Sequence, residues 1–344
     1  ISGKETLEHG LTHDNVFRFL LDQLLAAFPY ARDSVSDLST REAAQLHAIP
    51  SHVAMKYWRS LTQSLEPCRG GILLFANARS TSDTVLVYGA RLAGVRSVVL
   101  ELANLRPEPL EVDAIFAPSH FAASHPSVLQ AVRATRAYVL STGVDTSVFA
   151  PPTPRSRASK AEEHFVVAYV GRLSVEKSVG LILAMAKAVA LSCPSCRFHI
   201  IGDGPLKAHL QALAGAWGLL GAVRFVDGIY DDEAALARVL QSVHAYFSPC
   251  FFETLGIAAL EAMSVGVPVI GFRTGGASEY LVDGYNGVVL DDTSPETLGD
   301  AVERLEREPA MRRRLGENAR RTVRERFSLQ RSVHKYAALY ERLA

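Results

Sequence analysis

The stretch "FVVAYVGRLSVEKSVGLILAMAKAV", residues 165–189, joins an apolar run of strand length to an amphipathic helical pattern through a short polar turn. From residue 70 onwards, apolar runs of four to seven residues alternate in the same way with longer helical patterns. This alternation is typical of parallel βαβ units and not of a β-sandwich. The sequence therefore predicts an α/β protein.

The strand pattern occurs in two series separated by a polar segment. We predict strands at 72–76, 97–102, 113–117 and 137–141, and again at 165–171, 197–202, 223–227, 244–248 and 267–272. Residues 149–164 are rich in Pro, Ser and charge and have no apolar period, as in an interdomain linker. We therefore predict an N-terminal domain at 1–150, a linker at 151–164, a second domain at 165–328 and a C-terminal helix at 329–344 that packs back toward the first domain. Helical patterns are also expected over residues 1–65 and 80–94.

Composition narrows the class of protein. The 344 residues are 48% hydrophobic, which is enough for a large core. Thirty-six basic residues balance thirty-six acidic ones, so no general field favours nucleic acid or an anionic membrane. The apolar runs are far shorter than the ~20 residues of a membrane-spanning helix, and we predict no transmembrane segment.

Four cysteines are too few for a disulfide scaffold. Cys193 and Cys196 form a lone "CPSC" without the further ligands of a zinc site. We therefore expect ordinary reduced cysteines, which favours a cytoplasmic location or the cytosolic face of a membrane. The chain starts with Ile1, so we expect a processed chain or a piece of a longer one whose targeting segment lies outside this sequence.

In parallel sheets ligands bind at the carboxyl ends of the strands, which directs attention to the loops there. Arg172 and Lys177 lie in the turn between the strand at 165–171 and the next helix, where two cations beside a helix start suit a polyanion. The alternative is a solvated helix start with Glu176 paired to Lys177. The turn of Gly202, Asp203 and Gly204 allows a close backbone approach to a ligand, but alone it is a weak signal.

The segment "SPCFFETLGIAALEAMSVGVPVI", residues 248–270, places two acids among apolar residues. Glu253 lies just before a predicted helix start whose free amides include those of Leu255 and Gly256. Glu261 lies about two turns inside the helix, where a carboxylate without hydrogen-bond donors is costly. Sugar hydroxyls could supply those donors; the alternative is a structural Arg or Lys.

These motifs together resemble the family-4 retaining glycosyltransferases of the GT-B fold. The resemblance rests on "LSTGVDTSVFAPP", "YVGRLSVEK", "IIGDGP", "VRFVDGI" and the Glu253–Glu261 pair within the segment 247–290, and it covers about residues 70–344. It implies two Rossmann-like doubly wound domains that face each other across a cleft. It also implies a UDP- or GDP-sugar as donor substrate, a hydroxyl acceptor and no tightly bound cofactor or metal.

The resemblance assigns a role to each loop. Arg172 and Lys177 would act as catalytic residues that hold the donor diphosphate, and Glu253 would face the sugar near its anomeric carbon. Glu261 would accept hydrogen bonds from the ribose. The remaining donor-binding residues would be Gly171, Gly202, Asp203, Gly204, Thr254, Leu255 and Gly256.

The first half departs from the family pattern. The glycine-rich opening loop and the strand before it are not found, and the strand at 97–102 does not end in the family's histidine. Glu101 and Asn104 stand there as substitute sugar or acceptor contacts. His120 and His125 follow the next strand, and we expect His120 to serve as a helix-start or surface residue.

The leading functional hypothesis is a retaining hexosyltransferase that acts on a glycan, lipid or small-molecule hydroxyl. The alternative from another class is a non-catalytic GT-B module of a larger protein that binds a nucleotide sugar or glycan. Epimerase or phosphorylase chemistry is a third reading. No nucleic-acid partner is expected.

Overall fold

The computed structural model describes residues 69, 72–76, 96–102, 110–152, 164–227, 229 and 232–343. Most of the helical patterns and of the linker predicted before residue 164 lie outside these residues. The chain divides into two compact units. Unit 1 comprises Ile1–Pro118, Ala122–Val139 and Ala338–Ala344, and unit 2 comprises Ser119–Phe121 and Leu140–Ala337.

Unit 1 contains a parallel sheet in sequence order. Its strands are β1 (Ile72–Ala76), β2 (Ser97–Glu101), β3 (Leu110–Ala117) and β4 (Val132–Val139). The strands β3 and β4 begin earlier than predicted. Two short helices, α5 (His120–Ser124) and α6 (Pro126–Ala131), connect them. Buried side chains such as Leu100 and Phe116 show that the apolar runs of β2 and β3 form the core of this sheet.

Unit 2 contains a six-stranded parallel sheet in the order β10-β9-β8-β5-β6-β7. The strands are β5 (Phe165–Val170), β6 (Cys196–Ile201), β7 (Val223–Val226), β8 (Ala245–Ser248), β9 (Val269–Gly271) and β10 (Gly287–Val289). β10 was not predicted. The chain starts at β5, proceeds outward to β7 and then returns to β8 on the other side. This is the doubly wound order, and its switch point lies between β5 and β8.

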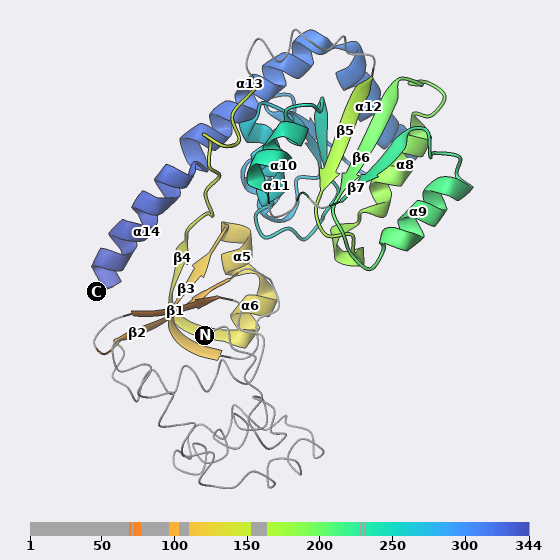
Figure 1. The fold of residues 1–344 in the computed structure, drawn as a ribbon. Coiled ribbons are helices and arrows are strands. Elements are labelled where there is room, and N and C mark those ends of the chain that lie inside the picture. Colours follow the sequence, from red (N-terminus) through yellow and green to blue (C-terminus); the bar gives the residue numbers. More distant parts are fainter. Residues whose placement is uncertain are drawn as a thin grey trace, which may run out of the picture. The chain divides into compact units, whose positions relative to one another are not determined.

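Helices cover both faces of this sheet, because β5 is apolar on each side. Phe165, Val167 and Tyr169 pack with α8 (Gly180–Ala188) and α9 (Lys207–Ala216), while Ala168 and Val170 pack with α10 (Glu233–Leu240) and α11 (Ile257–Ser264). Figure 1 shows α8 and α9 on one side of β5–β7, and α10 and α11 on the other. The result is a three-layer α/β/α unit with a core on each face.

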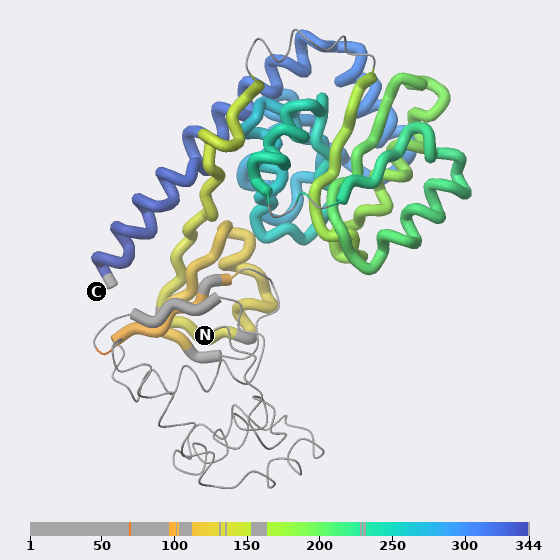
Figure 2. Tube along the Cα trace, in the orientation of Figure 1, coloured from red at the N-terminus to blue at the C-terminus, as the bar shows by residue number. Residues whose placement is uncertain are grey.

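The C-terminal helical pattern resolves into three helices, α12 (Pro295–Arg307), α13 (Pro309–Arg326) and α14 (Leu329–Leu343), coloured blue in Figure 2. Pro295 and Pro309 occupy first-turn positions, where proline's missing N–H costs nothing. The junction of α13 and α14 is tied to the chain after β4. There Val144 N–H donates to the Phe327 carbonyl, and Leu329 N–H donates to the Val144 carbonyl, each at 2.8 Å.

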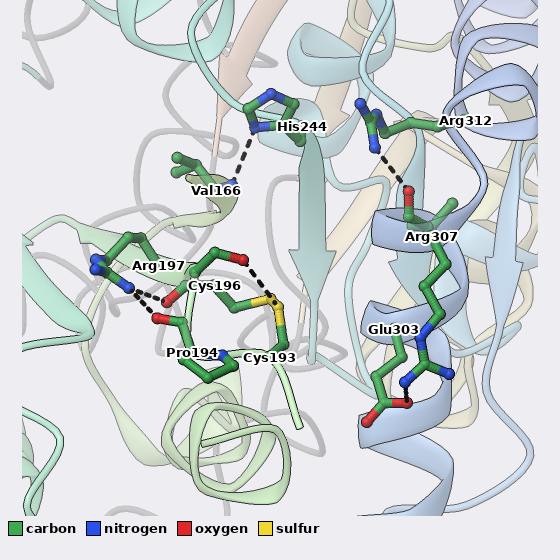
Figure 3. Close-up of a disulfide and its surroundings, with 11 residues drawn as sticks. Val166, Cys193, Pro194, Cys196, Arg197, His244, Glu303, Arg307 and Arg312 are labelled. Atoms are coloured by element: carbon green, nitrogen blue, oxygen red, sulfur yellow. Dashed lines mark hydrogen bonds and ion pairs between the residues drawn. A yellow bond between two sulfur atoms is a disulfide. The ribbon is translucent and has the colours of Figure 1, made fainter. Parts of the chain in front are cut away.

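The expectation of reduced cysteines is wrong for "CPSC". Cys193 and Cys196 form a disulfide across the turn between α8 and β6, with their Cα atoms 5.4 Å apart (Figure 3). Arg197 steadies this turn by donating to the carbonyls of Pro194 and Cys196. The turn brings the two residues within bonding reach, which the spacing alone could not show. The compartment inferred from reduced cysteines therefore loses its support.

Candidate active site

The loop after β5 carries two of the predicted cations. Gly171 follows the strand and donates its N–H to the Ile201 carbonyl. Arg172 is exposed, whereas Lys177 is half-buried at the end of the 3-10 turn η3 (Val175–Lys177). The Lys177 ammonium donates to Glu253 Oε2 at 2.7 Å. Lys177 is thus paired across the switch point with an acid that lies 76 residues further along the chain, and the alternative pairing with Glu176 is not what the structure shows.

The loop after β8 holds Glu253 and leads into α11. Gly256 starts this helix at a φ of 88°, a left-handed conformation that favours glycine, and it caps the helix without a side-chain hydrogen bond. Leu255 is buried, while the Thr254 carbonyl accepts a hydrogen bond from the Ser119 hydroxyl. The positive end of α11 therefore lies directly after Glu253 and Thr254. Such helix starts favour anions.

The loop after β6 is fastened to the loop after β5. Leu173 N–H donates to the Asp203 carbonyl, and Leu206 N–H donates to the Leu173 carbonyl, both at 2.9 Å. Gly204 has a φ of 156°, and a Cβ there would meet the Leu173 carbonyl oxygen at 2.5 Å. Only glycine fits between the two loops. Gly202 N–H donates to the Val226 carbonyl, and the Asp203 side chain is exposed.

Glu261 lies inside α11 and is partly buried. Burial, with a smaller effect of the negative Glu233, raises the pKa of Glu261 to about 7. Among the residues that the structure describes, no Arg or Lys pairs with this carboxylate. The alternative prediction, a structural ion pair of Glu261 with Arg or Lys, is therefore not seen. The Glu261 carboxylate can still accept hydrogen bonds from a ligand.

Three tyrosines beneath these loops were not singled out from the sequence. Tyr169 donates to the Arg172 carbonyl at 2.9 Å, and Tyr246 donates to the Val170 carbonyl at 3.1 Å. The Tyr280 hydroxyl lies near Gly256. Tyr169 is the last but one residue of β5, so its place near the strand end could have indicated it, whereas Tyr246, the second residue of the neighbouring β8, has no such signal.

The predicted contacts from the first half stay unassigned. Glu101 is the last residue of β2, and Asn104 lies outside the described residues. His125 caps α6 by accepting from the Ser127 amide, a role that was not assigned to it from the sequence. His120 is exposed at the start of α5.

The described residues provide neither a metal-binding cluster nor a membrane-spanning helix. No group of three or more His, Cys, Asp or Glu side chains among them could hold a metal ion. None of the helices described combines the length and the apolar character that a bilayer crossing requires. The arrangement that remains is two cations, a helix start and two acids at the carboxyl edge of one parallel sheet, which suits a ligand with a polyanionic and a hydroxyl-rich part.

Comparison with known proteins gives consistent likenesses. Residues 153–322 match the family model described as Glycosyl transferases group 1. The chain is similar to the alpha-D-kanosaminyltransferase of Streptomyces kanamyceticus, with 31% identity over 178 residues, or 52% of this chain and 46% of that protein. It is also similar to a GDP-mannose-dependent alpha-(1-6)-phosphatidylinositol monomannoside mannosyltransferase of Mycolicibacterium smegmatis. That identity is 34% over 179 residues, or 48% of this chain and 46% of the relative. The chain thus spans about half the length of the curated relatives it matches.

Solved structures resemble more of the chain. The Anabaena protein HepE in complex with UDP and glucose superposes with a TM-score of 0.69 at 18% identity, covering 96% of each chain. Sucrose-phosphate synthase of Thermosynechococcus elongatus gives 0.68 at 20% identity, covering 87% of this chain and 81% of that one. At these identities the likeness shows the fold, which is GT-B. The α/β class and the GT-B fold predicted from the sequence are confirmed.

Proposed function

Because residues 153–322 belong to the glycosyl transferases group 1 family, we propose that this chain transfers a hexose from a UDP- or GDP-sugar to a hydroxyl acceptor with retention of configuration. The observation that carries the proposal is the Lys177–Glu253 pair, 2.7 Å long, which joins the loops after β5 and β8 beside the start of α11. A cation, an acid and free helix amides meet there, at the place where a doubly wound sheet binds its ligand.

The proposed step needs charge stabilisation. The bond between the anomeric carbon and the diphosphate oxygen breaks, and its electron pair stays on the diphosphate. The acceptor oxygen bonds to the same face of the sugar and passes its proton to the leaving diphosphate. Arg172, Lys177 and the amides at the start of α11 stabilise the growing negative charge, and such preorganised donors are worth about 10²- to 10³-fold in rate each.

The acids serve the neutral parts of the donor. Glu253 lies beside Lys177, so a diphosphate held by that lysine brings the adjoining sugar to Glu253. Glu261 lies eight residues further along, in α11, and accepts from the ribose hydroxyls. The glycine turn after β6, with Gly202 and Gly204, borders the nucleotide. We assign the contacts to the acceptor to the N-terminal domain predicted at residues 1–150.

A donor panel tests the proposal. Purified protein is assayed for hydrolysis and transfer with UDP-, GDP- and ADP-sugars, together with Lys177→Ala, Glu253→Ala and the control Lys187→Ala, an exposed lysine of α8. We expect turnover of one donor class, a loss of at least about 100-fold in the two site variants and no change in the control. Binding without turnover under any acceptor would favour a non-catalytic module. No binding of any donor would refute the site assignment.

A further inference from the structure

The hydroxyl of Tyr280 is buried and has no partner. Tyr280 follows the 3-10 turn η4 (Gly275–Glu279), is 1% exposed and packs its ring edge-on against Phe327 at 5.7 Å between centroids. Among the described residues, nothing hydrogen-bonds to its Oη. A buried O–H without a partner is costly, so one that persists calls for a reason.

The unpartnered hydroxyl faces the loop that holds Glu253. A Cβ placed on Gly256 would meet Tyr280 Oη at 2.7 Å and Glu253 Cγ at 3.2 Å, so both atoms border the same point. Burial, together with the negative Glu253, raises the pKa of Tyr280 above its usual value. The phenol therefore stays protonated and can act only as a donor toward a carboxylate.

Two other side-chain donors near Glu253 are already in use. Lys177 donates to Glu253 Oε2, and the Cys250 thiol donates to the Glu176 carbonyl at 3.3 Å. Burial, with the negative Glu253, raises the pKa of Cys250 to about 11, so this thiol is not a competing anion at neutral pH. Among the described side chains that border Glu253, Tyr280 therefore offers a donor that has no partner.

We propose that Tyr280 is a positioning residue that hydrogen-bonds to Glu253 when a bound diphosphate draws Lys177 away from it. The inference rests on the proposed function, in which Lys177 must reach the diphosphate. Lys177 leaves Glu253 as it binds phosphate oxygens, and the half-buried carboxylate then lacks its partner. A rotation of the Glu253 side chain would bring its carboxylate to Tyr280 Oη, because Tyr280 Oη and Glu253 Cγ border the same point next to Gly256. Tyr280 so offsets the cost of breaking the ion pair and holds Glu253 for the sugar.

The variant Tyr280→Phe tests this exchange. It removes one oxygen that has no partner in the free protein, so thermal stability should be unchanged or slightly higher. We expect the affinity for UDP or GDP, measured by calorimetry, to fall about tenfold, as for the loss of one hydrogen bond to a charged group. Tyr246→Phe is the matched control: its hydroxyl is already bonded to the Val170 carbonyl, so it should lower the melting temperature and leave nucleotide affinity unchanged.

A double-mutant cycle separates the exchange from a packing effect. In the Glu253→Ala background no carboxylate needs a new partner, so Tyr280→Phe should change UDP affinity less than twofold. An equal loss in both backgrounds overturns the inference, as does an unaltered affinity for Tyr280→Phe in the otherwise native protein.

A crystal structure of the unaltered protein with UDP provides a measurement that needs no variant. We expect Lys177 on the diphosphate and Tyr280 Oη about 3 Å from a Glu253 oxygen. A Lys177 ammonium that contacts the diphosphate of UDP while it stays on Glu253 overturns the exchange and leaves the proposed function intact. If the unaltered protein binds no nucleoside diphosphate or nucleotide sugar, the proposed function fails, and the inference fails with it.

Discussion

Replacing Glu261 by Gln should stabilise the protein at high pH and have little effect at low pH. Burial raises the pKa of Glu261 from its ordinary 4.5 to about 7, so the folded state favours the protonated acid. The resulting penalty is absent below pH ~4.5, grows as pH rises and is complete above pH 7. Since a tenfold change in proton affinity is worth about 1.4 kcal/mol, the penalty at pH 8 is about 3 kcal/mol. Gln has the same shape and no charge.

Thermal unfolding at pH 5 and pH 8 measures this effect. A gain of about 3 kcal/mol should raise the melting temperature of Glu261→Gln by about 5 to 10 °C at pH 8, and by a small fraction of that at pH 5. Glu317→Gln, at an exposed position of α13, is the control and should show no pH-dependent gain. A loss of stability of equal size at both pH values would refute the reasoning, because it would mean that the carboxylate has a stabilising partner.

The same titration should appear in ligand binding. Ribose hydroxyls that donate to Glu261 stabilise its ionised form, so UDP or GDP affinity should rise from pH 5 to 7 and level off above. Glu261→Gln should abolish this rise. A pH dependence that persists in the variant would assign it to another group.

Three further predictions concern single features. Arg172→Ala, which removes an exposed guanidinium, should weaken UDP or GDP binding about tenfold in calorimetry without lowering the melting temperature, and unaltered binding would remove Arg172 from the site. Replacing Cys193 and Cys196 together by Ser should lower the free energy of unfolding by about 2 kcal/mol and leave nucleotide affinity unchanged. Reduction of the disulfide with dithiothreitol should have the same effect. Equal stability of the protein with and without the disulfide would contradict this prediction. Gly204→Ala should lower the free energy of unfolding by about 2 kcal/mol or more and weaken nucleotide binding. Gly221→Ala, which has open space for its Cβ, should change the free energy of unfolding by no more than about 0.5 kcal/mol. Equal effects of the two substitutions would contradict the prediction, because they would show that the loop relaxes around the added methyl group.

The strands that the sequence located well are those buried on both faces. β5 and β8 are continuous apolar runs bounded by turns, and such runs are visible without any tertiary information. β9 and β10 each have three residues, but β9 lies within the longer run "VPVIGF", whereas β10 has only the short run "GVVL". β4 was predicted too short because its first five residues include Arg133 and Arg136, which are exposed on a strand at the edge of the sheet.

Site residues that follow converging strand ends could be predicted from the sequence. Those that are brought to the site by packing between distant segments could not. Parallel topology places the loops of Lys177 and Glu253 together, so their proximity follows from the strand assignment. Tyr280 was missed because a tyrosine in "ASEYLV" has no feature that distinguishes it from a core aromatic. Its unpaired hydroxyl and its position beside Gly256 arise from packing between segments that are distant in sequence.

The hydrogen bonds that fasten Leu173 to Asp203 and Leu206 bear on protein engineering. Each loop supplies backbone partners to the other, and Gly204 leaves no space between them. An insertion or a graft in either loop would therefore break the backbone hydrogen bonds between the loops after β5 and β6 and displace the cations that follow β5. Side-chain exchange at exposed positions of these loops changes no loop length. Donor preference in this scaffold should accordingly be altered by point substitution, with loop lengths held fixed.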